Sequence, residues 1–259
     1  MTPRSWDKWI DRYEGRGYRV IAPTWPGMDA DIEDLRRDPS AMAGVGMTEI
    51  TDHYDGIICA VDTPPIIMGH SFGGGVTQLL LDRGLGSAGV AIHPAPVKGV
   101  LRLPLSALRS AFPVLRNPAN RHRAVPLTPK QFHYAFTNTL SEEESQAVYE
   151  RYHVPGTGRV LFQAATANLN PHAATKVNFK SESRAPLLVV GGGKDHTVPP
   201  SLSKEVATRQ GKAKSATEYK EYPGRSHYTL GQDGWEEVAD YALSWAIRHA
   251  AARRQPATT

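Results

Sequence analysis

The sequence of 259 residues is poor in cysteine and has no long apolar run. Its one cysteine, Cys59, excludes an internal disulfide, and nothing in the cysteine count indicates export. Because Cys59 lies within an apolar run, we expect it to be buried rather than reactive. No window approaches the ~18 consecutive apolar residues of a membrane span, and the N-terminus lacks the apolar core of a signal peptide. We therefore expect a soluble, cytoplasmic protein without a membrane span.

Charge and motif content exclude several classes of partner. The formal net charge is only +4, and no dense basic stripe with interleaved aromatic residues indicates a nucleic-acid partner. No histidine pair has the H-E-x-x-H spacing of a zinc site, and the glycine run at 69–75 does not match G-x-G-x-x-G. The run that ends at Lys194 lacks the Ser or Thr that follows the lysine of a phosphate loop. We expect neither a metal nor a cofactor.

Short apolar or β-branched runs alternate with helical patterns along much of the chain. Helices are predicted over 48–61, with Thr48 as N-cap, and over 76–81 and 235–250. This alternation predicts an α/β fold with a mostly parallel sheet, flanking helices and right-handed crossovers. The predicted strands are 18–22, 65–69, 89–93, 187–191 and 217–222.

The segment 94–185 breaks this alternation and is rich in proline. Capping boxes that begin at Thr128 and Ser141 predict helices within it. We predict a helical lid or cap, 94–185, inserted into a core formed by 1–93 and 186–259. Its aromatic residues are candidate pocket walls, although packing within the lid is the favoured role of any single one, and its leucines favour an apolar pocket. The aromatic residues are Phe112, Phe132, Tyr134 and Phe136, and the leucines are Leu101, Leu103, Leu105 and Leu108.

The clearest chemical motif is G-x-S-x-G at residues 69–73. It lies directly after an apolar strand and directly before a helix, where a sharp turn projects the Ser71 hydroxyl beyond the sheet. Glycine is expected at both 69 and 73, because a Cβ there would collide with neighbouring elements. The backbone N–H of Phe72, at the start of the helix, is a candidate donor to an oxyanion. The pattern therefore predicts Ser71 as a nucleophile.

A nucleophilic serine needs a base, and the base needs an acid that orients it. Asp195 follows the predicted strand 187–191, and His227 follows the predicted strand 217–222. Both positions lie beyond the carboxyl ends of strands, where ligands gather in open α/β sheets. The chain order Ser71, Asp195, His227 is the order of this kind of triad. We predict Asp195 as the acid and His227 as the base.

These motifs resemble those of the α/β-hydrolase superfamily. The runs GHSFGG, DHTVP and GRSH, which carry the three residues, are similar to its nucleophile, acid and histidine motifs. The run YRVIAPTWPG at 18–27 is similar to its fourth strand and following loop. The resemblance covers essentially the whole chain and implies an esterase-like fold and mechanism. Relatives that open halides or epoxides carry Asp where Ser71 stands, so those reactions are disfavoured.

The sequence departs from that family at its beginning. The family's earlier strands, and the His-Gly loop that supplies a second oxyanion donor, are not found before 18–22. We therefore expect 18–22 to shift toward the gap in the sheet, or to pair with another chain, for example in a homodimer. The chain as given should then be a weak or unstable esterase.

The leading prediction is hydrolysis of a carboxylic ester, or a related acyl bond, through an acyl-serine intermediate. The apolar residues at 101–112 favour a neutral, apolar small-molecule ester as the substrate. Arg102, Arg109 and Arg116 recur every seven residues and are read as a solvated face rather than as a site for acidic substrates. The alternatives are a non-catalytic or weakly active binding protein that keeps the pocket, and an acyltransferase or lyase on the same scaffold.

Overall fold

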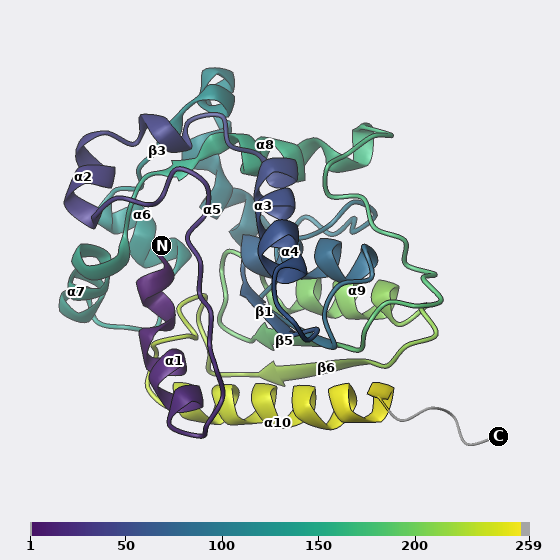
Figure 1. Ribbon diagram of the computed structural model, residues 1–259. Helices are drawn as coiled ribbons and strands as arrows, with labels where there is room; N and C mark the ends of the chain where they lie inside the picture. The colour runs from purple at the N-terminus through teal and green to yellow at the C-terminus, as the bar shows by residue number, and fades with distance from the viewer. Residues whose placement is uncertain (1, 255–259) are drawn as a thin grey trace.

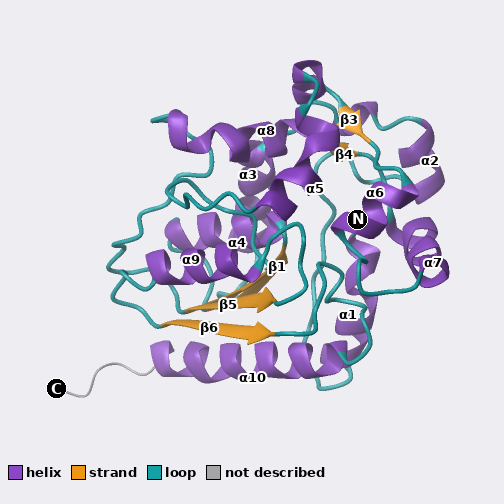
Figure 2. Cartoon of the chain, turned by 180° about the vertical axis from the view of Figure 1, so that it is seen from behind, coloured by secondary structure: helices purple, strands orange, loops and turns teal. Residues whose placement is uncertain are grey.

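The computed structural model describes residues 2–254. A four-stranded parallel sheet with the order β1-β2-β5-β6 forms its centre (Figures 1 and 2). All four strands coincide with predicted strands to within a residue or two, so the parallel α/β prediction is confirmed. The strands are β1 (Ile66–His70), β2 (Ala88–Ile92), β5 (Leu187–Gly192) and β6 (Thr217–Tyr222).

Helices cover both faces of the sheet. On one face lie α1 (Asp7–Glu14), which follows the 3-10 turn η1 (Pro3–Trp6), and the long α10 (Trp235–Arg254) below the strands (Figure 1). On the other face lie α4 (Phe72–Asp82) and α9 (Pro200–Gln210), and α3 (Met47–Cys59) packs against α4.

Strand side chains alternate between the two faces, as the pleat requires. Val90 and Val190 pack with Trp9 and Trp245 against α1 and α10. The intervening residues of the same strands, such as Val189, pack toward α9. The two middle strands are therefore buried on both faces, and this accounts for their continuously apolar sequences.

The prediction of a strand at 18–22 is wrong for this structure. The segment is extended but belongs to neither sheet, and Tyr18 and Ile21 are 41% and 49% exposed. It is tied to α3 instead, because the Tyr54 hydroxyl donates to the Pro23 carbonyl at 2.8 Å and His53 contacts the Thr24 carbonyl. A cavity separates it from β1, so within residues 2–254 it does not close the edge of the sheet.

The segment 94–185 contains four helices between β2 and β5, with two 3-10 turns and a small antiparallel strand pair. Both predicted capping boxes are present, at Thr128 and Ser141. Arg36 of α2 (Ile32–Arg37) donates to three carbonyls near the end of α7 (Glu142–Tyr152) and so joins this segment to α2. The elements are α5 (Leu105–Leu115), η3 (Pro118–His122), β3 (Ala124–Val125), α6 (Pro129–Ala135), α7 (Glu142–Tyr152), β4 (Gly156–Thr157), α8 (Gly158–Thr166) and η4 (Ala167–Leu169), and before them α2 (Ile32–Arg37) and η2 (Ser40–Met42).

Two local predictions on α3 are also wrong. Cys59 is exposed rather than buried, because it is the last residue of the helix and its thiol donates to Asp55. This hydrogen bond raises the pKa of the thiol, so Cys59 is not an activated nucleophile. The helix begins at Met47 instead of after Thr48, and the free Met47 N–H donates to Gln163 of α8 at 2.8 Å. Among the described helices, none has the length and apolarity needed to cross a membrane.

Candidate active site

Ser71 occupies a strained turn between β1 and α4. Its φ of 56° and ψ of −120° lie outside the regions that L-residues ordinarily adopt. The Ser71 N–H donates to the Ile92 carbonyl at 3.0 Å, which holds the turn against the end of β2. The serine itself lines the large cavity described below. The predicted elbow is therefore present, with Ser71 at its apex.

The glycines of the elbow do not all have the predicted role. A Cβ at Gly69 would overlap the carbonyl of Gly73, so glycine is required there. A Cβ at Gly73 would meet no described atom within 4 Å beyond its neighbours in the chain and helix, so the predicted requirement at this position is wrong. The second crowded position is Gly74, where a Cβ would lie 2.9 Å from the Cα of Pro94.

Phe72 supplies a backbone donor next to the serine. It is the first residue of α4, so its N–H has no carbonyl partner one turn earlier in the helix. The positive end of the helix dipole adds to its attraction for negative charge. The nearby Ala95 N–H is already used, because it donates to the Ser71 carbonyl at 2.8 Å.

Asp195 and His227 form a buried hydrogen-bonded pair. His227 Nδ1 lies 2.6 Å from Asp195 Oδ2, and both side chains are fully buried. The other carboxylate oxygen, Oδ1, accepts the N–H groups of Thr197 and Val198 at 2.7 Å each. Burial by itself would raise the pKa of Asp195, but His227 and a hydrogen bond from a second histidine, His93, hold it well below its usual range. The carboxylate is therefore ionised and fixed.

His227 is held beside the elbow, but its ring is not joined to the serine hydroxyl. His70 Nε2 donates to the His227 carbonyl at 2.8 Å, and Phe136 stands edge-on to the ring with centroids 5.0 Å apart. Within the described chain, His227 Nε2 has no hydrogen-bond partner. Catalytic hydrogen bonds are often long without substrate and tighten in the complex. The structure thus joins the predicted acid and base, and it places the predicted nucleophile directly after His70, whose ring centroid lies 4.6 Å from that of His227.

A second histidine, His93, binds the same carboxylate oxygen. It directly follows β2, and its Nδ1 lies 2.8 Å from Asp195 Oδ2. The side chain is fully buried, its φ is 44°, and burial lowers its pKa. In the sequence, His93 is only the last residue of the predicted strand 89–93. Its place at the carboxyl end of that strand is the signal that could have identified it, because Asp195 and His227 also lie beyond the carboxyl ends of strands.

Three histidines bring ring nitrogens close together. His70, His93 and His227 each have one nitrogen within 4.8 Å of the others, which is a spacing that a metal ion could use. However, both Nδ1 atoms that face Asp195 are engaged with its carboxylate, and His70 Nε2 is engaged with a carbonyl. These hydrogen bonds fix the positions of the three rings.

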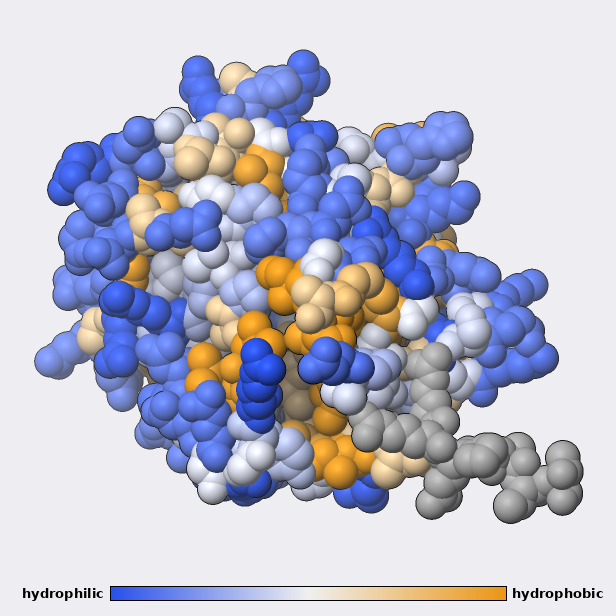
Figure 3. Space-filling view, viewed as in Figure 1, coloured by the Kyte–Doolittle hydropathy of each residue, from blue (hydrophilic) through white to orange (hydrophobic). Residues whose placement is uncertain are grey.

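A cavity of about 1,140 Å³ extends from Ser71 along the outer edge of β1. On the face in Figure 3, apolar side chains surround a hollow above α10, in the region where Figure 1 places β1. Few of the lining residues carry a formal charge, namely Arg19, Asp62 and Arg102. Most of the others are apolar, and they include Trp25, Met28, Ile58, Ile66, Met68, Val76, Val114, Val154 and Leu161.

The candidate pocket walls divide into two groups. Phe132 and Phe136 line the cavity, as do Leu101, Leu103 and Leu108. The remaining three, Leu105, Phe112 and Tyr134, are not among the lining residues. Phe112 is 61% exposed on the outside of α5, and Tyr134 lies under the guanidinium of Arg109 at 4.1 Å.

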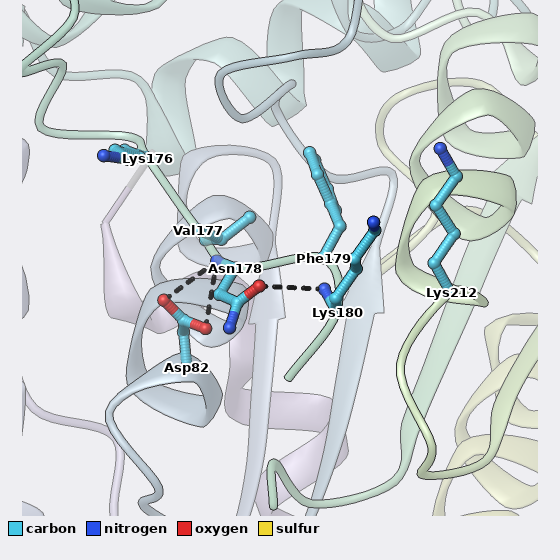
Figure 4. A pocket seen from close by; sticks show the side chains of 7 residues that line it. All are labelled: Asp82, Lys176, Val177, Asn178, Phe179, Lys180 and Lys212. Carbon is cyan, nitrogen blue, oxygen red and sulfur yellow. Dashed lines mark hydrogen bonds between the residues drawn. The ribbon is translucent and has the colours of Figure 1, made fainter. Parts of the chain in front are cut away.

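A smaller hollow of about 500 Å³ lies between α4 and the 176–180 loop (Figure 4). The carboxylate of Asp82 accepts the Asn178 N–H there at 3.1 Å, so it is already engaged. The side chains of Lys176, Lys180 and Lys212 point in different directions in Figure 4 and do not converge on one point. This hollow therefore lacks the convergent polar groups of a binding site.

Most of the chain matches one known protein family. The profile of the alpha/beta hydrolase family matches residues 1–241. The chain belongs to that family. No functionally curated protein matches it in sequence.

Several solved structures share the fold at low sequence identity. A monoacylglycerol lipase from Paleococcus ferrophilus is 19% identical, with a TM-score of 0.62 over 94% of this chain and 89% of that one. A pyrethroid hydrolase from Sphingobium faniae JZ-2 is 16% identical, with a TM-score of 0.62 over 96% and 94%. A methylesterase from Arabidopsis is 12% identical, with a TM-score of 0.63 over 95% and 94%. At such identities the likeness establishes the fold.

Proposed function

We propose that this alpha/beta hydrolase is a serine hydrolase that cleaves carboxylic esters. The observation that carries the proposal is the buried Asp195–His227 pair, 2.6 Å apart, beside a strained turn with Ser71 at its apex. A buried, ionised carboxylate fixes the tautomer of a histidine and stabilises the charge that it gains as a base. Strain at the serine is a feature of nucleophile elbows, since it exposes the hydroxyl.

In the proposed mechanism, Ser71 Oγ attacks the carbonyl carbon of the ester while its proton passes to His227 Nε2. The Phe72 N–H stabilises the oxyanion that forms. When the tetrahedral intermediate collapses, the bond to the leaving alcohol breaks and His227 returns the proton to it. Water then attacks the acyl-serine with His227 again as base, and the acid is released.

The cavity supports a neutral, apolar substrate. Its lining is mainly aliphatic and aromatic, and 94–185 supplies part of that lining, so we propose that this segment acts as a lid. Arg102 lines the cavity, but Arg109 and Arg116 do not, and Arg109 lies over the Tyr134 ring instead. The three arginines therefore do not form a joint site for an acidic substrate.

Labelling with a fluorophosphonate probe tests the nucleophile. We expect the wild-type protein to be labelled and to hydrolyse a short-chain aryl ester, and Ser71→Ala to lose both properties. Ser110→Ala is the matched control, because Ser110 lines the same cavity but its hydroxyl donates to the His196 carbonyl. His227→Ala and Asp195→Asn should each abolish most turnover and add little to Ser71→Ala, since a triad acts as a unit.

One observation favours a second candidate function, that of a non-catalytic binding protein. Among residues 2–254, His227 Nε2 has no hydrogen-bond partner, and β1 is an edge strand beside a large cavity. Binding of an apolar ester without turnover, and no labelling of Ser71 by the probe, would establish this alternative. Retention of most activity in folded Ser71→Ala would remove Ser71 from the mechanism.

A further inference from the structure

Two imidazoles share one oxygen of the Asp195 carboxylate. His227 approaches Oδ2 from the loop after β6 at 2.6 Å, and His93 approaches it from the end of β2 at 2.8 Å. A hydrogen bond from each Nδ1 to an ionised carboxylate requires a proton on that nitrogen. Asp195 Oδ2 therefore accepts two N–H donors, of which the proposed mechanism uses only one.

We infer that His93 is a positioning residue. Its hydrogen bond fixes the Asp195 carboxylate and offsets part of the negative charge that this carboxylate presents to His227. The inference rests on the proposed function, because it assigns His93 a role in the same acid–base pair. His93 acts through Asp195 and touches neither the substrate nor the serine in this scheme.

The geometric part of the role follows from the four hydrogen bonds to Asp195. Oδ1 is fixed by two backbone amides, those of Thr197 and Val198. Oδ2 is held from two sides by the rings of His93 and His227. If the His93 bond is removed, His227 is the only described side chain that binds Oδ2. The orientation of the base then depends on a contact that must itself change charge during each turnover.

The electrostatic part of the role follows because His93 and His227 donate to the same carboxylate oxygen. A donor on Oδ2 offsets part of the carboxylate charge, so the carboxylate stabilises a protonated His227 less strongly. Without His93, His227 should hold its proton more tightly, and the acidic limb of the rate profile should move to higher pH. The groups that face His93 are Asp195, His227 and Arg225 from the loops after β5 and β6, and His70 from the end of β1.

The local structure is arranged around this ring at some cost. His93 has a φ of 44°, which is unfavourable for a residue with a side chain. A Cβ on Gly192 of β5 would overlap the His93 ring, so a glycine leaves the space that the ring occupies. Its Nε2 is buried without a partner among the described residues. An apolar side chain would fill this place without an unpaired polar atom, so packing alone does not explain a histidine.

A matched pair of variants separates positioning from packing. His93→Asn keeps a donor near the place of Nδ1 and tolerates a positive φ, whereas His93→Leu has a similar volume and no donor. For His93→Leu we expect kcat/KM to fall about tenfold and the midpoint of its acidic limb to rise by roughly 0.5–1 pH unit. His93→Asn should stay within about twofold of the wild-type value and keep the wild-type midpoint. Melting temperatures of both variants identify any loss of folding.

Proton NMR supplies a readout that does not depend on turnover. Wild-type protein should show two low-field imidazole N–H signals from the rings bound to Asp195, and His93→Asn should show one of them, shifted. An active wild-type enzyme in which His93→Leu and His93→Asn have the same acidic limb would overturn the inference, as would a single low-field signal in the wild type. Absence of fluorophosphonate labelling together with two such signals would instead refute the proposed function and leave the shared carboxylate established.

Discussion

The stability of the protein should fall in mild acid, and His153 is one of the buried histidines that contribute to this loss. It follows α7 and is 5% exposed, with its ring stacked on Tyr149 at 4.4 Å between centroids. Its Nε2 accepts the Leu127 N–H at 3.1 Å, so the folded protein needs this nitrogen unprotonated. Burial, with a further contribution from the cation Arg36, lowers the pKa of His153 to about 3.

The sign and size of the effect follow from linkage. An unfolded chain binds a proton at His153 below a pKa of about 6.5, whereas the folded protein does so only near pH 3. The contribution of His153 to the free energy of unfolding is therefore fully present above pH 6.5 and is lost as the pH falls from 6.5 toward 3. At pH 5 the gap is about 1.5 pH units, which corresponds to about 2 kcal/mol. Allowing for residual solvent contact, we expect a loss of roughly 1–2 kcal/mol from this residue.

The assay compares urea unfolding at about pH 7 and pH 5 in wild type and His153→Gln. Glutamine keeps an acceptor for the Leu127 amide and does not titrate, so the variant should lose roughly 1–2 kcal/mol less than wild type between the two pH values. His172→Gln is the control, because His172 is exposed, and it should behave like wild type. An equal loss in wild type and His153→Gln, with unchanged m-values, would refute the reasoning.

Two further predictions concern the elbow and the substrate. Gly69→Ala should prevent formation of the elbow and abolish both labelling and hydrolysis. Gly73→Ala should retain both, because a Cβ there meets no described atom within 4 Å beyond its neighbours. Equal damage by the two substitutions would contradict the packing argument. Neutral esters of short to medium chain should be turned over faster than carboxylate-bearing esters, and Arg109→Ala should leave that preference unchanged. A strong preference for carboxylate-bearing esters that is lost on Arg109→Ala would reverse this assignment.

The parts of the fold that were predictable are those that local sequence determines. The strand 187–191 was found because a continuous apolar run ends at glycine. The capping boxes at Thr128 and Ser141 were found because four consecutive residues suffice to define them. Ser71 was found in the same way, since its motif and its strand–turn–helix setting are contiguous.

The parts that were missed depend on contacts between distant segments. The run 18–22 has the composition of a strand, but Tyr54 and His53 of α3 hold its end away from β1. Cys59 has apolar neighbours in sequence, yet it ends its helix on the surface beside Asp55. The role of His93 follows from its distance to Asp195, 102 residues away, which no local pattern encodes.

The register of the sheet links the fold to the chemistry of the site. His70 lies opposite Ile92, and Ile92 lies opposite Val190, so Ser71 and His93 leave their strands at nearly the same level. Asp195 and His227 follow the same edge of β5 and β6. A slip of one residue between β2 and β5 would turn His93 toward the opposite face and remove it from Asp195. The register of β2 against β5 therefore matters beyond the core, because the shared carboxylate depends on it.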